Sequence, residues 1–394
     1  MSTSAGATDA LTRLPPGSAF EGADIGAEGR GRAAPRSLAD TIAEARRQVE
    51  ICNACRYCEG FCAVFPAITR ERTFADGDLT QLANLCHNCR GCYYACQYTA
   101  PHEFDLNVPA VLSDLRARSF EEFVWPSALG RLFQRSGVAI ALLATLGFAV
   151  LWAAIAWLPG EGPAAERGFY AYLSHAAMVA IFLPAFVLPF AAIGVGLYRY
   201  WKHVGAGRFS LRALWRAGAS AGRLDNMSGG QGQGCNYEEE DAYSNRRRVF
   251  HQLTMYGFLL CFASTSSGTI MHYAFDWPAP YGFWTPPKLL GVPGGIMLCV
   301  GTAGLLWLKT LADPKLGSLN RWGGEAGFSV LLFAVGLTGL LLYWAGGTAL
   351  VPALLAIHLG AVLAFFLLLP YSKMVHGFFR MAALTVDAQR RAPR

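Results

Sequence analysis

Residues 52–62 read CNACRYCEGFC and residues 86–96 read CHNCRGCYYAC, so two runs place four cysteines at the same offsets. Each run has the spacing C-x2-C-x2-C-x3-C, which is typical of thiolates that hold [4Fe–4S] clusters. Zinc is the alternative, but zinc knuckles pair two separated C-x2-C units, whereas here a third and a fourth cysteine follow at once. The two runs therefore predict a ferredoxin-like module with two [4Fe–4S] clusters.

The ligands of these clusters are expected to cross between the runs. In such sequences the fourth cysteine usually binds the cluster of the other run. Disulfides are a poor alternative, because one helical turn crowded with thiols offers few suitable geometries. We therefore expect two sets of ligands. The first set is Cys52, Cys55, Cys58 and Cys96. The second set is Cys86, Cys89, Cys92 and Cys62.

The spacing of prolines and the length of the spacer favour a helical module. Bacterial ferredoxins have proline directly after the fourth cysteine, whereas here Pro66 and Pro101 come four and five residues later. Together with the long segment between the runs, this favours a helical ferredoxin domain, similar to that of succinate dehydrogenase iron–sulfur subunits, over the compact β-rich type.

Other residues near the runs receive simpler interpretations. Arg56 and Arg90 could raise cluster potentials or dock an acidic partner, but we expect them to be solvated surface charges. His87 and His102 are expected to be polar neighbours rather than ligands. No ligand role is expected for the three remaining cysteines, Cys235, Cys261 and Cys299.

The rest of the chain has the composition of a membrane protein. Of its 394 residues 53% are hydrophobic and only 15% charged, against about 25% charged in an average soluble domain. A bilayer core needs roughly 20 apolar residues in a helix. Six stretches meet this requirement: 136–158, 173–198, 252–275, 290–311, 327–345 and 349–370.

The distribution of Lys and Arg predicts the orientation of these spans. The segments after the second, fourth and sixth spans hold 17 of them, whereas those after the first, third and fifth hold 2. The positive-inside rule places the basic side in the cytoplasm. No secretory signal is visible in the first 45 residues. We therefore expect an inner-membrane protein with both termini and both clusters in the cytoplasm, where thiols remain reduced.

These observations predict an all-α protein in which a cytosolic helical ferredoxin-like domain precedes a six-helix, cytochrome b-like membrane bundle. The first part, rich in Ala, Gly, Ser and Pro, is expected to be disordered. The predicted divisions are a tail at 1–40, a cluster domain at 41–135, a membrane domain at 136–375 with a cytoplasmic loop at 199–250, and a cytoplasmic tail at 376–394.

Histidines at helix ends suggest bis-histidine haem. His251 and His272 mark the two ends of the third span, and His358 and His376 those of the antiparallel sixth span. His272 can then face His358, and His251 can face His376, in two layers that would each hold a b-type haem. Eighteen residues make about five turns, so a continuous helix would put His358 and His376 on one face.

The haem prediction leaves alternatives open. His175 and His203 lie near the two ends of the second span, so either could replace a ligand. One haem or two would satisfy the pattern. The simpler interpretation is that these histidines form hydrogen bonds between helices or at the membrane interface.

Several further segments resemble one family. They are the two cysteine runs together with GCNYEEEDAYSNRRRVFHQL (234–253), YGFLLCFASTSSGTIMHY (256–273) and LPYSKMVHGFFR (369–380). They resemble the tricarballylate utilisation TcuB family, also called CitB, over residues 45 to 385. The C-terminal half of the cobalamin-biosynthesis protein CobZ is similar, and nitrate reductase cytochrome b subunits resemble the membrane part more loosely.

The resemblance implies an electron-transfer subunit without substrate chemistry of its own. Its partner would be an FAD-dependent dehydrogenase, TcuA, which oxidises tricarballylate to cis-aconitate. This chain would reoxidise the reduced flavin and pass electrons onward to quinone within the lipid bilayer. Haem ligation by His251, His272, His358 and His376 and cluster ligation by the eight cysteines would agree with this role, and no nucleic-acid partner is expected.

Two alternative functions have different sequence signatures. One is another membrane-bound reductase or a CobZ-like module. The Cys-Cys-Gly motifs of heterodisulfide reductases are missing from the chain. The other is a transporter with a regulatory cluster. That function would favour buried charges along a substrate path, but the predicted spans are nearly free of Asp and Glu.

Overall fold

The computed structural model describes residues 37–157, 174–227, 229, 232–238, 241–317 and 322–391. Most of the tail predicted at 1–40 lies outside them. Within the described residues the regular structure is helical, and two isolated β-bridges join Cys235 to Ser244 and Glu238 to Ala312. The prediction of an all-α fold is confirmed.

The cluster-bearing segment folds into short helices, which we call the head. Its first helix begins at a capping box, because the Ser37 hydroxyl accepts from the Asp40 amide at 3.1 Å while the Asp40 carboxylate accepts from the Ser37 amide at 3.0 Å. The fifth is capped by the side chain of Asn107, which accepts from the Ala110 amide. The head helices are α1 (Leu38–Cys55), α2 (Val64–Thr69), α3 (Asp76–Leu85), α4 (Gly91–Tyr94) and α5 (Val108–Phe123).

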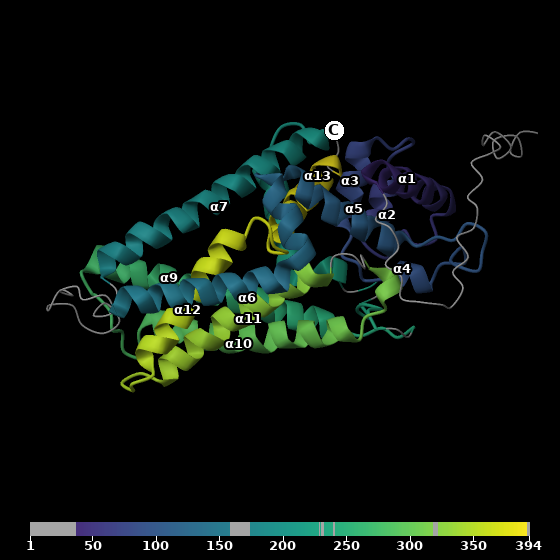
Figure 1. Ribbon diagram of the computed structural model, residues 1–394. Coiled ribbons are helices and arrows are strands. Elements are labelled where there is room, and N and C mark those ends of the chain that lie inside the picture. The colour runs from purple at the N-terminus through teal and green to yellow at the C-terminus, as the bar shows by residue number, and fades with distance from the viewer. Residues whose placement is uncertain are drawn as a thin grey trace, which may run out of the picture. The chain divides into compact units, whose positions relative to one another are not determined.

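Long apolar helices follow the head. Helix α6 (Ser127–Trp157) contains a break at Ser136, where the backbone leaves the helical region. It is followed by α7 (His175–His203), the shorter α8 (Leu211–Arg223), and then α9 (Arg246–Phe275), α10 (Pro286–Thr310), α11 (Trp322–Trp344) and α12 (Val351–Leu368). Helices α6, α10, α11 and α12 run side by side (Figure 1).

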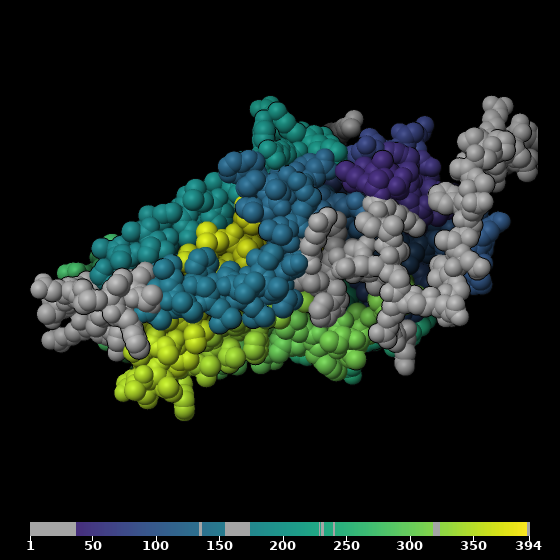
Figure 2. Space-filling view, in the orientation of Figure 1, coloured from purple at the N-terminus to yellow at the C-terminus, as the bar shows by residue number. Residues whose placement is uncertain are grey.

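Five of these helices are long and apolar enough to cross a membrane, which indicates a multi-pass membrane protein. Much of their apolar surface has no protein against it; Leu143 and Val150 of α6, for example, are each 69% exposed. α12 packs against α6 and α7, and C-terminal residues are visible between those two helices in Figure 2. The five spans are Ser136–Ala153, His175–His203, Pro286–Thr310, Gly324–Trp344 and Val351–Leu368.

The third predicted span, 252–275, belongs to α9, and its composition sets it apart from those five. Its 30 residues are long enough to cross a bilayer, at about 45 Å. The run STSSGT at 264–269 lowers its hydropathy. These hydroxyls have partners, however: Thr265 and Ser266 donate to the carbonyls of Cys261 and Phe262 one turn earlier. The structure thus supports five of the six predicted spans by composition, and α9 by length.

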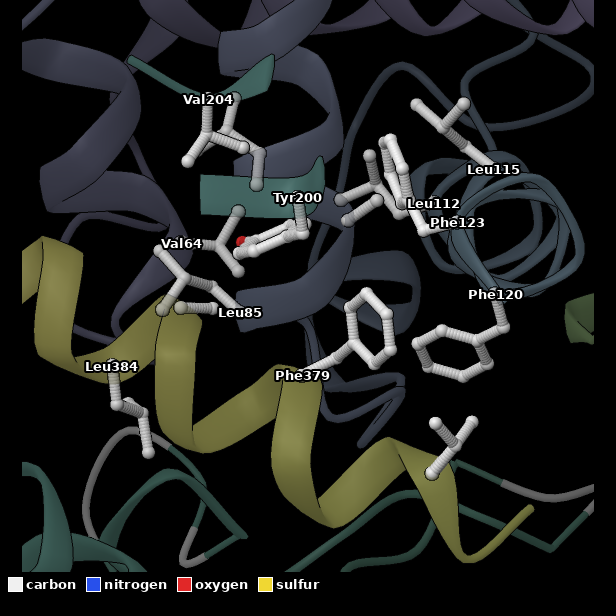
Figure 3. Packing of buried hydrophobic residues seen from close by; sticks show 14 of the residues in the cluster. Val64, Leu85, Leu112, Leu115, Phe120, Phe123, Tyr200, Val204, Phe379 and Leu384 are labelled. Carbon is white, nitrogen blue, oxygen red and sulfur yellow. The ribbon is translucent and has the colours of Figure 1, made fainter. Parts of the chain in front are cut away.

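The chain returns to the head after its last span. α12 ends at Leu368, and α13 (Val375–Arg390) begins after a turn, so the continuous helix expected from His358 to His376 is interrupted. The residues predicted as a C-terminal tail form most of α13. Figure 3 shows Phe379 of α13 among Phe120 and Phe123 of α5 and Tyr200 of α7, with ring centroids 5.2 to 6.2 Å from it.

Two buried hydrogen bonds of Gln81 join α3 of the head to α7 and to α13. Tyr200 is completely buried, and its hydroxyl donates to Gln81 Oε1 at 2.6 Å. The amide of the same Gln81 donates to the Ala383 carbonyl at 2.7 Å. Gln81 therefore connects three segments that are far apart in the sequence.

We predict that Tyr200→Phe lowers the free energy of unfolding by about 1–3 kcal/mol, because Gln81 Oε1 is left buried without a donor. Denaturant unfolding in detergent micelles would measure the change. Tyr198→Phe is the matched control on the same helix: Tyr198 is 61% exposed, so its effect should stay within about 0.5 kcal/mol. Equal effects of the two substitutions would contradict the role given to this hydrogen bond.

Candidate cofactor sites

The first predicted ligand set surrounds one cavity. Cys52 and Cys55 lie on the last turn of α1, which ends where Arg56 adopts a left-handed conformation with φ 57°. Cys58 follows in the next turn, and Cys96 comes from the far side, just after α4. All four line a cavity of about 240 Å³. The structure thus brings Cys96 of the second run to the three leading cysteines of the first.

The second predicted set is also gathered in space. Thiolate charges at Cys86 and Cys89 raise the pKa of Cys62 by repulsion, after the larger effect of burial. Cys92 is affected in the same way by its neighbours Cys89, Cys86 and Cys62. Cys62 therefore lies with the second run rather than with its own, as crossed ligation requires.

These thiols are in surroundings that oppose their ionisation. Burial and neighbouring cysteines raise the pKa of Cys52 and Cys58 to about 12, and the pKa of Cys89 also to about 12. The thiolate is the form that binds metal, so a metal centre must supply the positive charge that stabilises it. The eight cysteines of the two sets are all without disulfide partners, which fits that requirement.

The thiols of the first set are spread around a cavity. A zinc ion draws its four ligands to one point, whereas a [4Fe–4S] cluster takes each thiolate at a different iron. Among the described residues no three His, Cys, Asp or Glu side chains converge on a position for one metal ion. The first set instead encloses a volume, with Tyr98 and Leu106 completing its wall.

A loop between α8 and α9 covers the second set. The Asn236 amide donates to the Cys89 carbonyl at 2.8 Å, and Cys235 is fully buried against Cys89. The ring of Tyr243 lies so close to Gly91 that a Cβ there would approach its hydroxyl to 3.1 Å. Cys235 thus has a packing role beside the second set. Sequence analysis missed this cover, although GCNYEEEDAYSN was among the segments that carried the resemblance.

Arginines form an inner layer around the second set. Arg90 is only 3% exposed, so the expectation of a solvated charge is wrong there, whereas Arg56 is exposed as expected. Arg90 donates to the Tyr237 carbonyl at 2.9 Å and lies over the Tyr237 ring, with Arg247 on the same ring. Arg90 is buried because the loop carrying Tyr237 folds back on it, a long-range contact that the sequence does not indicate.

Two of the predicted haem ligands meet at the junction of head and membrane helices. His251 of α9 and His376 of α13 have ring centroids 6.0 Å apart and line one cavity of about 140 Å³. His87, next to Cys86, lines the same cavity. The cavity therefore connects the surroundings of the second cysteine set with a histidine pair.

The ring nitrogens of this pair are suited to bind a metal. Nδ1 of His376 donates to the Lys373 carbonyl, which leaves Nε2 with a free lone pair. Burial and the charge of Arg380 lower the pKa of His376 well below its usual value, so the ring is neutral. Nδ1 of His251 is buried and has no hydrogen-bond partner. His251 and His376 would be the residues that hold a haem at this cavity, since haem iron binds imidazole nitrogen.

His358 lies in a second and larger cavity within the membrane helices. This cavity, of about 790 Å³, has mainly apolar walls from α7, α9, α10, α11 and α12. The Thr338 hydroxyl donates to the Ala334 carbonyl at 2.7 Å and is 3.0 Å from His358 Nδ1. It therefore accepts from Nδ1–H, and the lone pair of His358 is on Nε2. Four glycines line the same cavity and have no side chains that would fill it, namely Gly291, Gly295, Gly336 and Gly339.

The remaining histidines have other neighbours. His272 stacks on His175, with ring centroids 4.3 Å apart, and neither lines the large cavity. His203 lies 3.1 Å from the Thr80 hydroxyl through Nε2, and Thr80 itself donates to Asp76. His102 contacts Tyr98 and Phe104 in the head. The structure thus pairs His251 with His376 and His175 with His272, and it gives His358 a hydroxyl partner in its own cavity.

Comparison with known proteins assigns the chain to a family. The profile described as citrate utilization protein B matches residues 131–394, and that of its Fer4-like domain matches residues 45–122. The chain belongs to the citrate utilization protein B family. Citrate utilization protein B of Escherichia coli is 40% identical over 349 residues, which cover 88% of this chain and 92% of that protein. No solved structure gives a significant match. The resemblance found in the sequence is confirmed.

Membership of this family agrees with the geometry of the head. The Fer4-like match spans both cysteine runs, and its eight cysteines are the ones that the structure gathers into two sets. An iron–sulfur module is therefore consistent with both the family match and the geometry of the head. The family match covers the membrane helices as well.

We predict that Cys96→Ser lowers the iron content from about eight to about four atoms per chain, because one of two [4Fe–4S] clusters loses a ligand. Iron analysis of anaerobically purified protein would measure this. Cys261→Ser is the control, because Cys261 lies in α9 away from both sets and should keep all iron.

The crossing of ligands has a separate test by electron paramagnetic resonance. Cys96→Ser should remove the same spectral component as Cys52→Ser, and Cys62→Ser the same component as Cys86→Ser. If Cys62→Ser instead removes the component lost in Cys52→Ser, each run serves its own cluster.

Proposed function

We propose that this chain is a membrane electron-transfer subunit that reoxidises the reduced FAD of a partner dehydrogenase. In this proposal the partner resembles TcuA and acts on tricarballylate or a related tricarboxylate, and the electrons pass to quinone. When bound, [4Fe–4S] clusters and haem b each carry one electron at a time. The two electrons of a reduced flavin would therefore be passed on singly.

The proposal rests on one observation above all: the eight thiols form two adjoining sets, and the second lies beside a cavity lined by His251 and His376. Cys58 is close enough to Cys92 for their charges to interact, so the two sets are neighbours. Cys55 is exposed, which leaves the first set open to a partner. The arrangement runs from an accessible entry, through a buried set, to the ends of the apolar helices.

The chain's own residues hold these positions. Arg116 and Arg380 both donate to the Cys86 carbonyl, and Arg247 donates to the Asn88 carbonyl at 2.7 Å. They fix the loop that carries the second set against α5, α9 and α13. Glu325 is paired with Lys309 at 2.5 Å and with Lys373 at 3.0 Å on the wall of the junction cavity. These pairs anchor α10 and α11 to the turn before α13.

We further propose that α9 crosses the membrane as a sixth span, with both termini in the cytoplasm. Its length and the internal bonding of its hydroxyls support this. An even number of spans also agrees with the head and α13, which lie at opposite ends of the chain, packing together on one side.

Haem is proposed at the histidines that retain free ring nitrogens. His251 and His376 fit one site at the junction, and His358 fits a second in the large apolar cavity, which neither His272 nor His175 lines. The apolar walls and small residues around His358 suit a porphyrin.

We predict that His358→Ala reduces the haem content of the purified protein, because among the described residues His358 is the only histidine that lines the large cavity. A pyridine haemochrome spectrum would measure haem per chain. His102→Ala is the control, because His102 lies in the head among aromatic rings. A haem content unchanged by His358→Ala would remove this residue from the ligand set.

The function itself has a direct assay. Mixed with a reduced TcuA-like flavoprotein and a soluble quinone analogue, the loaded protein should reoxidise the flavin at a rate proportional to its concentration. Cys52→Ser should abolish this dependence, whereas Cys299→Ser should retain it. Reoxidation that proceeds equally well without this chain would contradict the proposal.

A further inference from the structure

The two cysteine sets differ in the charge that surrounds them. Among the residues lining the first cavity Arg56 alone is charged. It is exposed, and its Nε donates to the Asn53 carbonyl at 2.9 Å. Water and salt therefore screen its charge from the first set.

The second set, in contrast, lies within a layer of arginines held by backbone carbonyls. Arg116 and Arg380 converge on the carbonyl of Cys86, itself one of the predicted ligands. Arg247 reaches Asn88, and Arg90 directly follows Cys89 and is almost completely buried. Arg116, Arg247 and Arg380 also line the junction cavity.

Four carboxylates among the described residues lie near these groups. Asp313 is near Arg90 and Glu325 is near Arg247, while Glu238 and Asp241 of the covering loop lie near Cys235 and Tyr243. Glu325 is already shared between Lys309 and Lys373, which belong to the wall of the junction cavity. The charges bound to the ligand loop itself are the arginines, because Arg116, Arg380 and Arg247 donate to the carbonyls of Cys86 and Asn88.

Positive charge next to a redox centre favours the reduced form, which carries one more negative charge. Charge and hydrogen bonding around the sulfurs are among the properties that set a cluster's potential. The effect is strong where burial limits screening and weak at a solvated surface. Arg90 is buried and Arg116, Arg247 and Arg380 are half-buried beside the second set, so screening is limited there, whereas Arg56 is exposed.

We propose that Arg90, Arg116, Arg247 and Arg380 hold a cluster on the second set at a higher reduction potential than one on the first. The proposal rests on the proposed function and adds the direction of electron transfer between the two clusters. With clusters bound on both cysteine sets, one electron would pass from the first to the second, so that the first would be oxidised and the second reduced by the same electron. The step requires neither a proton nor another reactant. The arginines are positioning residues that bias this equilibrium.

The test is a redox titration of the loaded protein followed by electron paramagnetic resonance. The Cys86→Ser and Cys52→Ser variants assign each signal to a set. We expect the signal lost in Cys86→Ser to have the higher midpoint potential in the unsubstituted protein. Arg380→Gln should lower the ratio of reduced to oxidised cluster about tenfold at a fixed potential. This corresponds to a downward shift of the midpoint by about 59 mV for one electron. The other midpoint should change far less.

Two controls separate charge from structure. Arg380→Lys keeps the charge and should restore most of the midpoint in the same titration. Arg56→Gln removes the exposed arginine and should leave both midpoints unchanged. Iron content, measured in parallel, identifies variants that fail to load; Arg116→Gln then takes the place of Arg380→Gln.

Three outcomes would overturn the inference. They are a reversed or equal order of midpoints in the unsubstituted protein, a fully loaded Arg380→Gln with an unchanged midpoint, and an equal shift in Arg56→Gln. If both neutral variants lose iron, the order in the unsubstituted protein decides alone. No flavoprotein or quinone is present, so a wrong order leaves the proposed function standing, whereas a preparation without iron would end both.

Discussion

A buried thiol ionises only where positive charge compensates it. Five of the eight cysteines in the head have a pKa raised chiefly by burial, namely Cys52, Cys58, Cys62, Cys89 and Cys92. Burial and mutual repulsion raise the pKa of several of these cysteines, to about 12 for Cys52 and Cys58. Metal binding would supply the positive charge that their thiolate form requires. The short helices of the head, the loop before α9 and the arginines of α5, α9 and α13 would support such centres.

The support comes from distant parts of the sequence. α13 brings Phe379 to the core of the head and Arg380 to the carbonyl of Cys86, almost 300 residues earlier in the chain. α9 begins with Arg247 and His251, so that one turn of helix contributes both to the cysteine loop and to the junction cavity. The head and the membrane helices therefore share their side chains at the boundary, and residues 36–394 form a single compact unit.

Regular spacing made part of this arrangement predictable. The repeated C-x2-C-x2-C-x3-C pattern indicated the crossed sets, and the structure groups Cys96 with Cys52 and Cys62 with Cys86. Apolar length indicated five of the spans, and a cluster of serines and threonines made the sixth less distinct. Antiparallel order placed His251 near His376. Such features depend on local periodicity or on simple topology, which a sequence records directly.

Contacts between distant loops left no such record. Arg90 is buried because Tyr237 covers it, and nothing near Arg90 in the sequence indicates this. Likewise the turn between α12 and α13 redirects His376 away from the axis of His358. The arginine layer combines one residue from each of α5, α9 and α13 with Arg90, so only the assembled fold shows it.

The position of α13 also has a consequence for the order of biosynthesis. The first domain to leave the ribosome lacks part of its core until residues 375–390 have been made, since Phe379 and the Ala383 carbonyl complete contacts with Phe120 and Gln81. Domains usually fold as units while the chain is still being synthesised. Here the last helix has to be made before these contacts can form, so the core of the nascent head stays incomplete until α13 docks.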